Sequence, residues 1–243
     1  MHKIFDLEQE KKIKLLQKQV YEANLLLKEY QLVIHTWGNV SAITKDRKYI
    51  IIKPSGLEYK DLSPEKMVIV DRKLNVINSR LKPSTDTETH LQLYKSEKTI
   101  NAICHTHSTY ATSFCQAGKE IICYGTTHAD NFYQNIPITR ALNKKEITTN
   151  YELNTGKVII EHFKNKDLSL KKTNAVLVRE HGPFIWSFKN AKDVVDLALT
   201  LEQIAKMNIN CLIINPNIKG INQFLKDKHY QRKHGKDKYY GQN

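Results

Sequence analysis

The order of strand-like and helix-like segments most restricts what this chain can fold into. Short β-rich runs come in groups, with residues 49–53, 67–70 and 74–77 before one helical pattern and residues 175–179 and 184–186 before another. A parallel sheet requires strands and helices in regular alternation, because each connection between parallel strands crosses over the sheet, usually through a helix. That alternation is missing here. We therefore predict a mixed α/β fold whose central, largely antiparallel β-sheet is covered by helices on both sides.

The helices are indicated by apolar residues three and four positions apart, which share one helical face. Residues 7–30 have this pattern, and a second long example extends from an N-terminal cap at Asn190 through Met207. Thr85 and Glu88 have the spacing of a capping box before another helix. The remaining expectations are strands at 100–107 and 157–160 and a helix at 110–117.

Length and composition limit the classes of protein to which this chain can belong. A chain of 243 residues suits one large domain, so residues 1–243 are expected to form a single unit. No segment approaches the roughly 18 consecutive apolar residues of a membrane span, and the start of the chain lacks the pattern of a secretion signal. The four cysteines form no CxxC pair and are typical of reduced thiols, so we expect a cytoplasmic location.

The net charge of +13 raises nucleic acid as a partner. The basic residues, however, are spread over the whole chain without a nucleic-acid-binding motif. Neither nucleic acid nor a membrane is therefore an expected partner. A positive field also concentrates anionic substrates around an enzyme, which suits a protein that acts on phosphorylated small molecules.

Three histidines and a carboxylate have the arrangement of a metal site. His105 and His107 are two residues apart in a predicted strand, where such side chains point to the same face. His181 follows another β-rich run, which a Gly-Pro pair ends, and Asp86 precedes a predicted helix. Three imidazoles with one carboxylate are the ligands of a catalytic Zn²⁺ or a similar divalent ion.

Two turns carry the groups that bind phosphate. In Ile52-Lys53-Pro54-Ser55-Gly56, a predicted strand ends in a lysine and a Ser-Gly turn follows, which together offer an ammonium, a hydroxyl and backbone N–H groups. Lys82-Pro83-Ser84-Thr85 offers the same chemistry directly before Asp86. Taken alone, each segment is also an ordinary turn. Together they are consistent with a phosphorylated substrate that bridges turn and metal.

Two further segments carry ionisable groups whose role the residues alone leave open. Asp130 ends the run Gly125-Thr126-Thr127-His128-Ala129-Asp130. Near a metal pocket such a carboxylate serves as an acid or base, whereas elsewhere it is a loop residue with surface partners. The basic tail, from about residue 226 to 243, contains Tyr230, Tyr239 and Tyr240, which favour an ordered segment over a solvated one.

Seven stretches together resemble the L-ribulose-5-phosphate 4-epimerases of the class II aldolase family. HTHS and HGPF occur across class II aldolases, whereas THAD and the RKHG…YYGQ ending resemble the epimerases in particular. The resemblance runs from about residue 15 onward and implies a class II aldolase-like fold. The stretches that carry it are Thr36–Ser41, Ile52–Gly56, Lys82–Thr87, His105–Ser108, Gly125–Asp130, His181–Phe184 and Asp227–Gln242.

The resemblance implies a metal-dependent epimerase that interconverts L-ribulose 5-phosphate and D-xylulose 5-phosphate. His105, His107 and His181 would bind Zn²⁺, or another divalent metal such as Mn²⁺ or Co²⁺. Asp86 would be a further ligand. The residues that would line the substrate and phosphate pocket are Asn39, Lys53, Ser55, Gly56, Ser84 and Thr85.

The resemblance also implies a cyclic homotetramer with its active sites at the subunit interfaces. Asp130 and Tyr240 would be the acid/base pair, donated by a neighbouring subunit, so that the tail contributes to the active site. Arg232, in the same tail, would approach the phosphate end. The sequence departs from the family in two places. Thr85 replaces a frequent serine but keeps the hydroxyl, and Arg179-Glu180 replaces a smaller polar pair.

Inverting C4 of a 2-ketopentose phosphate is chemically demanding, because the C4 proton is not adjacent to the C2 carbonyl. Oxidation at C4 by a nicotinamide is one route, but no GxGxxG follows a strand, so no nucleotide cofactor is expected. The other route breaks and remakes the C3–C4 bond. It needs a Lewis acid, which a metal supplies, to stabilise the developing enediolate. It also needs a base to take the C4 hydroxyl proton and an acid to return it on the other face after the aldehyde rotates.

Two alternatives to the epimerase stay open. A class II sugar-phosphate aldolase would break the same bond and release its aldehyde. Such aldolases commonly have a glutamate where this chain has the shorter Asp86, which favours the epimerase. A non-catalytic binding protein on the adducin-head fold would be expected to lose the metal-binding histidines, and all three are present. The pathway served, arabinose catabolism or an ascorbate route, is also open.

Overall fold

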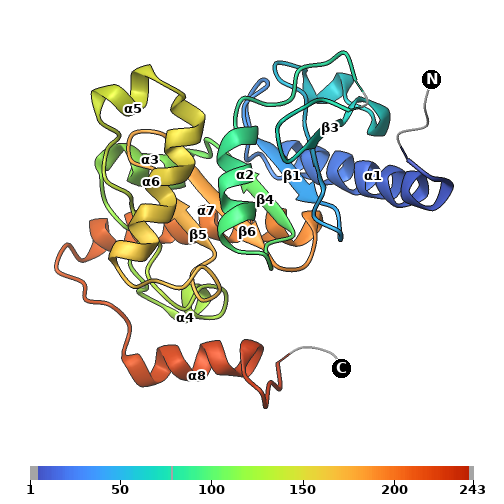
Figure 1. Ribbon diagram of the computed structural model, residues 1–243. Coiled ribbons are helices and arrows are strands. Elements are labelled where there is room, and N and C mark those ends of the chain that lie inside the picture. Colours follow the sequence, from blue (N-terminus) through green and yellow to red (C-terminus); the bar gives the residue numbers. More distant parts are fainter. Residues whose placement is uncertain (1–4, 78, 241–243) are drawn as a thin grey trace.

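A six-stranded antiparallel sheet lies at the centre of the described part of the chain, which in this computed structural model comprises residues 5–77 and 79–240 (Figure 1). The strand order is β3-β2-β1-β4-β6-β5, and every neighbouring pair is antiparallel. The strands are β1 (Asn39–Ile43), β2 (Tyr49–Ile52), β3 (Val68–Asp71), β4 (Ala102–His105), β5 (Ala175–Leu177) and β6 (Pro183–Ser187). The predicted antiparallel sheet is therefore confirmed.

Helices cover both faces of this sheet, as predicted. Figure 1 shows α2 (Thr87–Ser96) and α6 (Tyr151–Asn165) in front of the sheet and α7 (Ala191–Ile214) behind it. The face that α7 covers also packs against α1 (Leu7–Glu29) and α3 (Thr109–Ala117). The remaining helices are α4 (Thr126–Ala129), α5 (Lys144–Thr148), α8 (Gln223–His234), η1 (Tyr59–Asp61) and η2 (Pro64–Lys66).

Two apolar cores result from the alternation of side chains along the strands. In β4, Cys104 joins the core beneath α1 and α7, whereas its neighbour Ile103 joins the core beneath α2 and α6. Successive strand residues point to opposite faces, so a sheet buried on both sides needs apolar residues at nearly every position. All four residues of β4 are buried, which fits its place in the middle of the sheet.

Three predictions about local structure were wrong. Residues 157–160, predicted as a strand, lie in the middle of α6, where Thr155, Ile159 and Phe163 recur at helical spacing on its buried face. Residues 74–77 form only one bridge, from Val76 to Val70, rather than a strand. The capping box at Thr85 and Glu88 does not form, because Asp86 is the N-cap residue of α2 and makes no side-chain cap bond.

The predicted cap of the last long helix is confirmed, because the Asn190 side chain accepts a hydrogen bond from the Asp193 N–H. By length and composition alone, α7 could also cross a membrane. Its buried residues, among them Val194 and Leu201, belong to the core beneath the sheet. The core helix of a soluble protein passes the same test, so this is weak evidence for a membrane span.

The tail forms α8, a helix that stands apart from the sheet. Figure 1 shows it below the rest of the structure, at the end of a long connection from α7. None of its residues is buried, and α4 is the element that it contacts most. We call α8 and the residues that follow it, through Tyr240, the C-terminal arm. The last residues of the predicted tail, 241–243, lie outside the described residues.

Candidate metal and substrate site

Three histidines converge where β4 and the turn before β6 meet. His105 is the last residue of β4 and pairs with Phe184 of β6, which brings His181, three residues before Phe184, alongside it. His107 follows two residues after His105, and the Nε2 atoms of these two rings are 3.0 Å apart. One nitrogen from each of the three rings lies within 4.8 Å of the others. The structure therefore brings together the three predicted metal ligands.

A close approach of two backbone segments makes this arrangement possible. A Cβ on Gly182 would lie 2.6 Å from the carbonyl oxygen of Thr106, which is shorter than real contacts allow. Any side chain at this position would push the His181 turn away from the His105–His107 segment. Glycine at residue 182 is thus required by packing rather than by a turn conformation.

The histidines are in the neutral form that binds metals. His105 donates a hydrogen bond from Nδ1 to the carbonyl oxygen of Pro183 at 2.9 Å, which leaves the lone pair on Nε2. Burial, together with neighbouring His107, lowers the pKa of His105 to about 3. Burial also lowers the pKa of His181 to about 3, and that of His107. Three neutral imidazoles this close together fit a divalent ion such as Zn²⁺.

Asp86 lies in the same pocket but outside the cluster of three histidines. Its Oδ2 atom accepts a hydrogen bond of 2.7 Å from the amide nitrogen of Asn39. The Asn39 amide nitrogen also contacts the hydroxyl of Ser84 at 3.1 Å. The Oδ1 atom of Asn39 is buried and has no hydrogen-bond partner among the described residues. A buried acceptor without a partner is uncommon and marks a position where a ligand hydroxyl would bind.

The histidines form one end of a pocket that also contains both predicted phosphate-binding turns. The two turns are joined by a hydrogen bond from Ser55 N–H to Lys82 O at 2.9 Å and by another from Ser84 N–H to Lys53 O at 3.0 Å. The residues that line the pocket are Thr36, Trp37, Gly38, Asn39, Lys53, Pro54, Ser55, Gly56, Ser84, Thr85, Asp86, His105, His107, Tyr151, Glu152 and His181.

Lys53 places a positive charge in this pocket without a counter-ion. Its side chain is only 2% exposed, and its Nζ donates to the carbonyl oxygen of Thr36 at 3.0 Å and lies 5.0 Å from the centre of the Tyr59 ring. No carboxylate among the described residues forms an ion pair with it. Burial lowers the pKa of Lys53 to about 8. An anion bound beside Lys53 would offset the free-energy cost of burying its positive charge.

Asp130 is bound by the C-terminal arm instead of facing the histidines. Arg232 donates two hydrogen bonds to its carboxylate, at 3.0 and 2.6 Å, and His229 contacts it at 3.1 Å. Burial opposes ionisation of Asp130, but the hydrogen bonds from Arg232 and His229 outweigh it and lower the pKa of the carboxyl. The Arg232 guanidinium also lies 4.6 Å from the centre of the Tyr240 ring.

Asp130, Arg232 and Tyr240 thus form one group, and none of them lines the histidine pocket of the same chain. Tyr240 is 57% exposed, so its hydroxyl is accessible from outside the chain. Within one chain, the structure therefore separates the predicted acid/base pair from the predicted metal ligands.

Comparisons with known proteins identify the family. The model of the class II aldolase and adducin N-terminal domain family matches residues 18–209. This chain belongs to that family. It is also 56% identical to the "Probable L-ribulose-5-phosphate 4-epimerase UlaF" of Mycoplasma pneumoniae, over 96% of this chain and 97% of that protein.

Solved structures of class II aldolases have the same fold. An L-fuculose 1-phosphate aldolase superimposes with a TM-score of 0.70 at 22% identity, over 89% of this chain and 95% of the other. The L-fuculose 1-phosphate aldolase of Glaciozyma antarctica gives a TM-score of 0.70 at 14% identity, over 95% of this chain and 85% of the other. At these identities the likeness concerns the fold, and it confirms the predicted class II aldolase-like architecture.

The departure from the family at Arg179-Glu180 lies outside the pocket. The Arg179 guanidinium packs over Gly118, at the end of α3, and forms a 3.8 Å ion pair with Glu180. Glu180 has a left-handed backbone with a φ of 63°, and its side chain is exposed. Both side chains therefore lie away from the pocket that His181 lines.

Tyr151 and Glu152, in the first turn of α6, line the pocket but lie in none of the stretches that the sequence analysis singled out. The misassigned strand at 157–160 hid them, because it left the start of this helix unrecognised. A signal was available, since Tyr151, Thr155, Ile159 and Phe163 follow the helical spacing of four.

Proposed function

We propose that this class II aldolase family member is a metal-dependent L-ribulose-5-phosphate 4-epimerase. It interconverts L-ribulose 5-phosphate and D-xylulose 5-phosphate by opening and reclosing the C3–C4 bond. The observation that carries this proposal is one pocket with three neutral imidazoles at one end and a buried, uncompensated lysine among hydroxyl-bearing turns. The relative in Mycoplasma pneumoniae, 56% identical over nearly its whole length, supports the same activity.

His105, His107 and His181 would hold the divalent ion, which is Zn²⁺ or another such as Mn²⁺ or Co²⁺, with Asp86 as a further ligand. When bound, the ion supplies the Lewis acid that stabilises negative charge on the sugar oxygens during bond cleavage. Asn39 orients Asp86 through its amide nitrogen, and its unpartnered Oδ1 is available to a sugar hydroxyl.

The phosphate would bind at the two joined turns. Lys53 supplies the charge, and the groups around it that contribute hydroxyl and backbone N–H donors are Ser55, Gly56, Ser84 and Thr85. After C3–C4 cleavage, the two-carbon fragment retains this phosphate. The contact keeps the aldehyde in place while it turns its other face toward the three-carbon fragment.

The acid and base would come from a neighbouring subunit of a homotetramer. One group takes the C4 hydroxyl proton as the C3–C4 bond breaks, and the other returns a proton to the oxygen after the bond re-forms on the opposite face. Asp130 and Tyr240 are proposed for these roles, and Arg232 for the phosphate end. Their separation from the histidine pocket in one chain supports an active site built between two chains. We expect this enzyme in the cytoplasm.

A coupled assay on L-ribulose 5-phosphate tests the proposal. Purified protein should form D-xylulose 5-phosphate, lose this activity on treatment with a chelator and regain it with added Zn²⁺, Mn²⁺ or Co²⁺. Accumulation of free aldehyde without any epimer would instead identify an aldolase. Full activity in the presence of the chelator, in protein shown to be metal-free, would exclude the metal-dependent mechanism.

Substrate binding is expected to weaken above the pKa of Lys53, which burial lowers to about 8. Below this pH the side chain is charged and binds phosphate, and above it the neutral amine loses the attraction. Between about pH 7 and about pH 9, KM should rise about tenfold as this charged contact is lost. Initial rates measured across this range give KM directly.

The matched variant for this prediction is Lys53→Met, which keeps most of the side-chain volume without the charge. Its KM should already be high at pH 7 and should change little up to pH 9, with the metal content unaltered. The same rise of KM with pH in wild type and Lys53→Met would assign the titration to another group.

A further inference from the structure

Tyr151 contacts one of the three pocket histidines from outside the cluster. It is the first residue of α6, and its hydroxyl oxygen lies 3.2 Å from Nδ1 of His181. The two rings are tilted at 39° with their centres 5.9 Å apart. The side chain is half-buried and lines the histidine pocket. Since Nδ1 of His181 is occupied by this contact, Nε2 is the nitrogen left for an ion.

When Nε2 of His181 binds an ion, the hydroxyl of Tyr151 is the partner of its Nδ1–H. A neutral imidazole can bind a metal through Nε2 only when its hydrogen is on Nδ1. Nδ1–H then donates, and the phenol oxygen accepts. His105 has the same proton position, because its Nδ1 donates to the carbonyl oxygen of Pro183, which can only accept. Partners of this kind fix the tautomer and the orientation of a metal-binding histidine.

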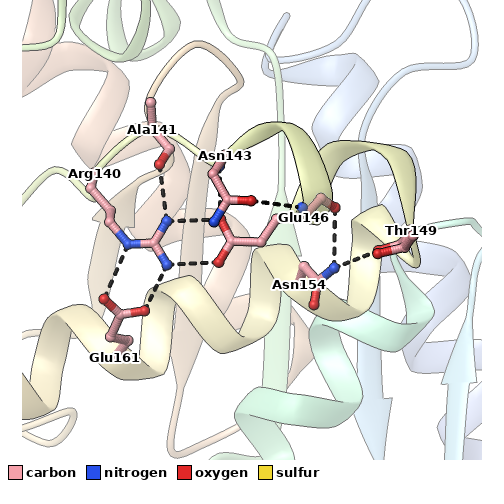
Figure 2. Close-up of polar contacts among 7 residues, drawn as sticks. All are labelled: Arg140, Ala141, Asn143, Glu146, Thr149, Asn154 and Glu161. Carbon is pink, nitrogen blue, oxygen red and sulfur yellow. Dashed lines mark hydrogen bonds and ion pairs between the residues drawn. The ribbon is translucent and has the colours of Figure 1, made fainter.

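The start of α6 is held in place by several independent contacts. Asn150 before it has a left-handed backbone, with φ 50° and ψ 53°, where an N-cap residue is normally extended. Thr89 of α2 donates a hydrogen bond to the carbonyl oxygen of Glu152 at 2.6 Å. The Asn154 side chain donates to the carbonyl oxygens of Thr149 and Glu146, which fixes the α5–α6 connection (Figure 2).

An ion-pair network fixes α5 against α6 on the outer side. Figure 2 shows Arg140 between Glu146 of α5 and Glu161 of α6, with its guanidinium bonded to both carboxylates at 2.7 to 3.1 Å. The hydrogen bonds from Arg140 lower the pKa of Glu146 to about 2, so the carboxylate stays charged at neutral pH. The start of α6 is thus held by contacts with α2 on one side and with α5 on the other.

We infer that Tyr151 is a positioning residue of the metal centre: its hydroxyl accepts from His181 Nδ1–H and holds the imidazole with Nε2 toward the ion. The inference rests on the proposed metal site. Tyr151→Phe removes the hydroxyl and keeps the ring, so the fold should be unaffected. Loss of a group that orients a ligand typically weakens metal binding 10–100-fold, and we expect a decrease of at least about tenfold.

The test measures metal affinity without using turnover. Metal-free wild type, Tyr151→Phe and the control Tyr49→Phe, which alters another half-buried tyrosine far from the pocket, are titrated with Co²⁺ and with Zn²⁺ against a competing chelator. We expect weaker binding and an altered Co²⁺ absorption spectrum in Tyr151→Phe alone, with the thermal unfolding of all three metal-free proteins alike.

This titration distinguishes failure of the proposed metal site from failure of the proposed role of Tyr151. If wild type binds no ion, the proposed metal site fails, and the role of Tyr151 fails with it. If wild type binds an ion and Tyr151→Phe binds it equally well with an unchanged Co²⁺ spectrum, the metal site stands and the role of Tyr151 is refuted. An equal loss of affinity in Tyr49→Phe would also refute the specific role.

Discussion

Protein with His107→Ala, or with His105→Ala, is expected to contain no tightly bound divalent ion and to have no measurable epimerase activity. The three imidazoles form the 4.8 Å cluster, so removing one leaves two of them and Asp86, which lies outside the cluster. Loss of an imidazole that binds the ion directly should weaken metal binding strongly, because catalytic zinc sites need at least three close protein ligands. Activity should disappear with the metal, since the ion supplies the Lewis acid for bond cleavage.

Metal per chain, measured by elemental analysis, and the coupled assay are the readouts for these variants. His107→Ala is the more informative one, because His105 stacks on Phe184 with ring centres 4.2 Å apart and contributes to packing. His162→Ala, which alters a half-buried histidine of α6 outside the pocket, is the matched control. One equivalent of metal and normal turnover in His107→Ala would remove the basis of the proposed mechanism.

Tyr240→Phe should reduce turnover by roughly 10²–10⁴-fold, the usual contribution of a general acid or base, and leave the metal content unchanged. The Tyr240 side chain is 57% exposed, so loss of its hydroxyl should not disturb the fold. Tyr239→Phe is the adjacent control, because Tyr239 is similarly exposed at 68% and has no proposed role. Near-normal turnover in Tyr240→Phe would refute the role of its hydroxyl.

Mixing two inactive variants tests whether the arm acts on a neighbouring subunit. Mixtures of His107→Ala and Tyr240→Phe chains, dissociated and reassembled together, contain sites with an intact pocket from one chain and an intact arm from another. With random head-to-tail assembly, about a quarter of the sites combine the two intact parts. Recovered activity would support the shared site, whereas an arm that serves its own chain would give no recovery.

The histidine cluster could be predicted from sequence because local rules determine most of it. His105 and His107 lie two residues apart at a strand end, and the Gly-Pro pair after His181 begins the next strand. The antiparallel sheet then joins these two places through the pairing of His105 with Phe184. The phosphate turns were recognised from their lysine, hydroxyl and glycine residues, and Lys53, Ser55, Gly56, Ser84 and Thr85 line the same pocket.

Other features depend on contacts that a linear pattern does not contain. The spacing of Thr85 and Glu88 fits a capping box, but the turn is instead organised by the bond from Asn39 to Asp86, residues 47 positions apart. Tyr151 escaped notice because the short apolar run at 157–160 is compatible with either a strand or a helix. The position of Asp130 relative to the histidines cannot follow from one chain if two chains form the site.

The absence of buried residues in α8 has an evolutionary consequence. Substitutions at exposed positions of a helix outside both cores usually change the free energy of unfolding little, whereas the central strands tolerate few changes. Relatives built on this scaffold can therefore keep the histidine pocket and vary the arm, which carries Tyr240, the residue proposed to transfer protons. If the arm has the proposed role, changes at the end of the polypeptide would alter the reaction without altering the sheet.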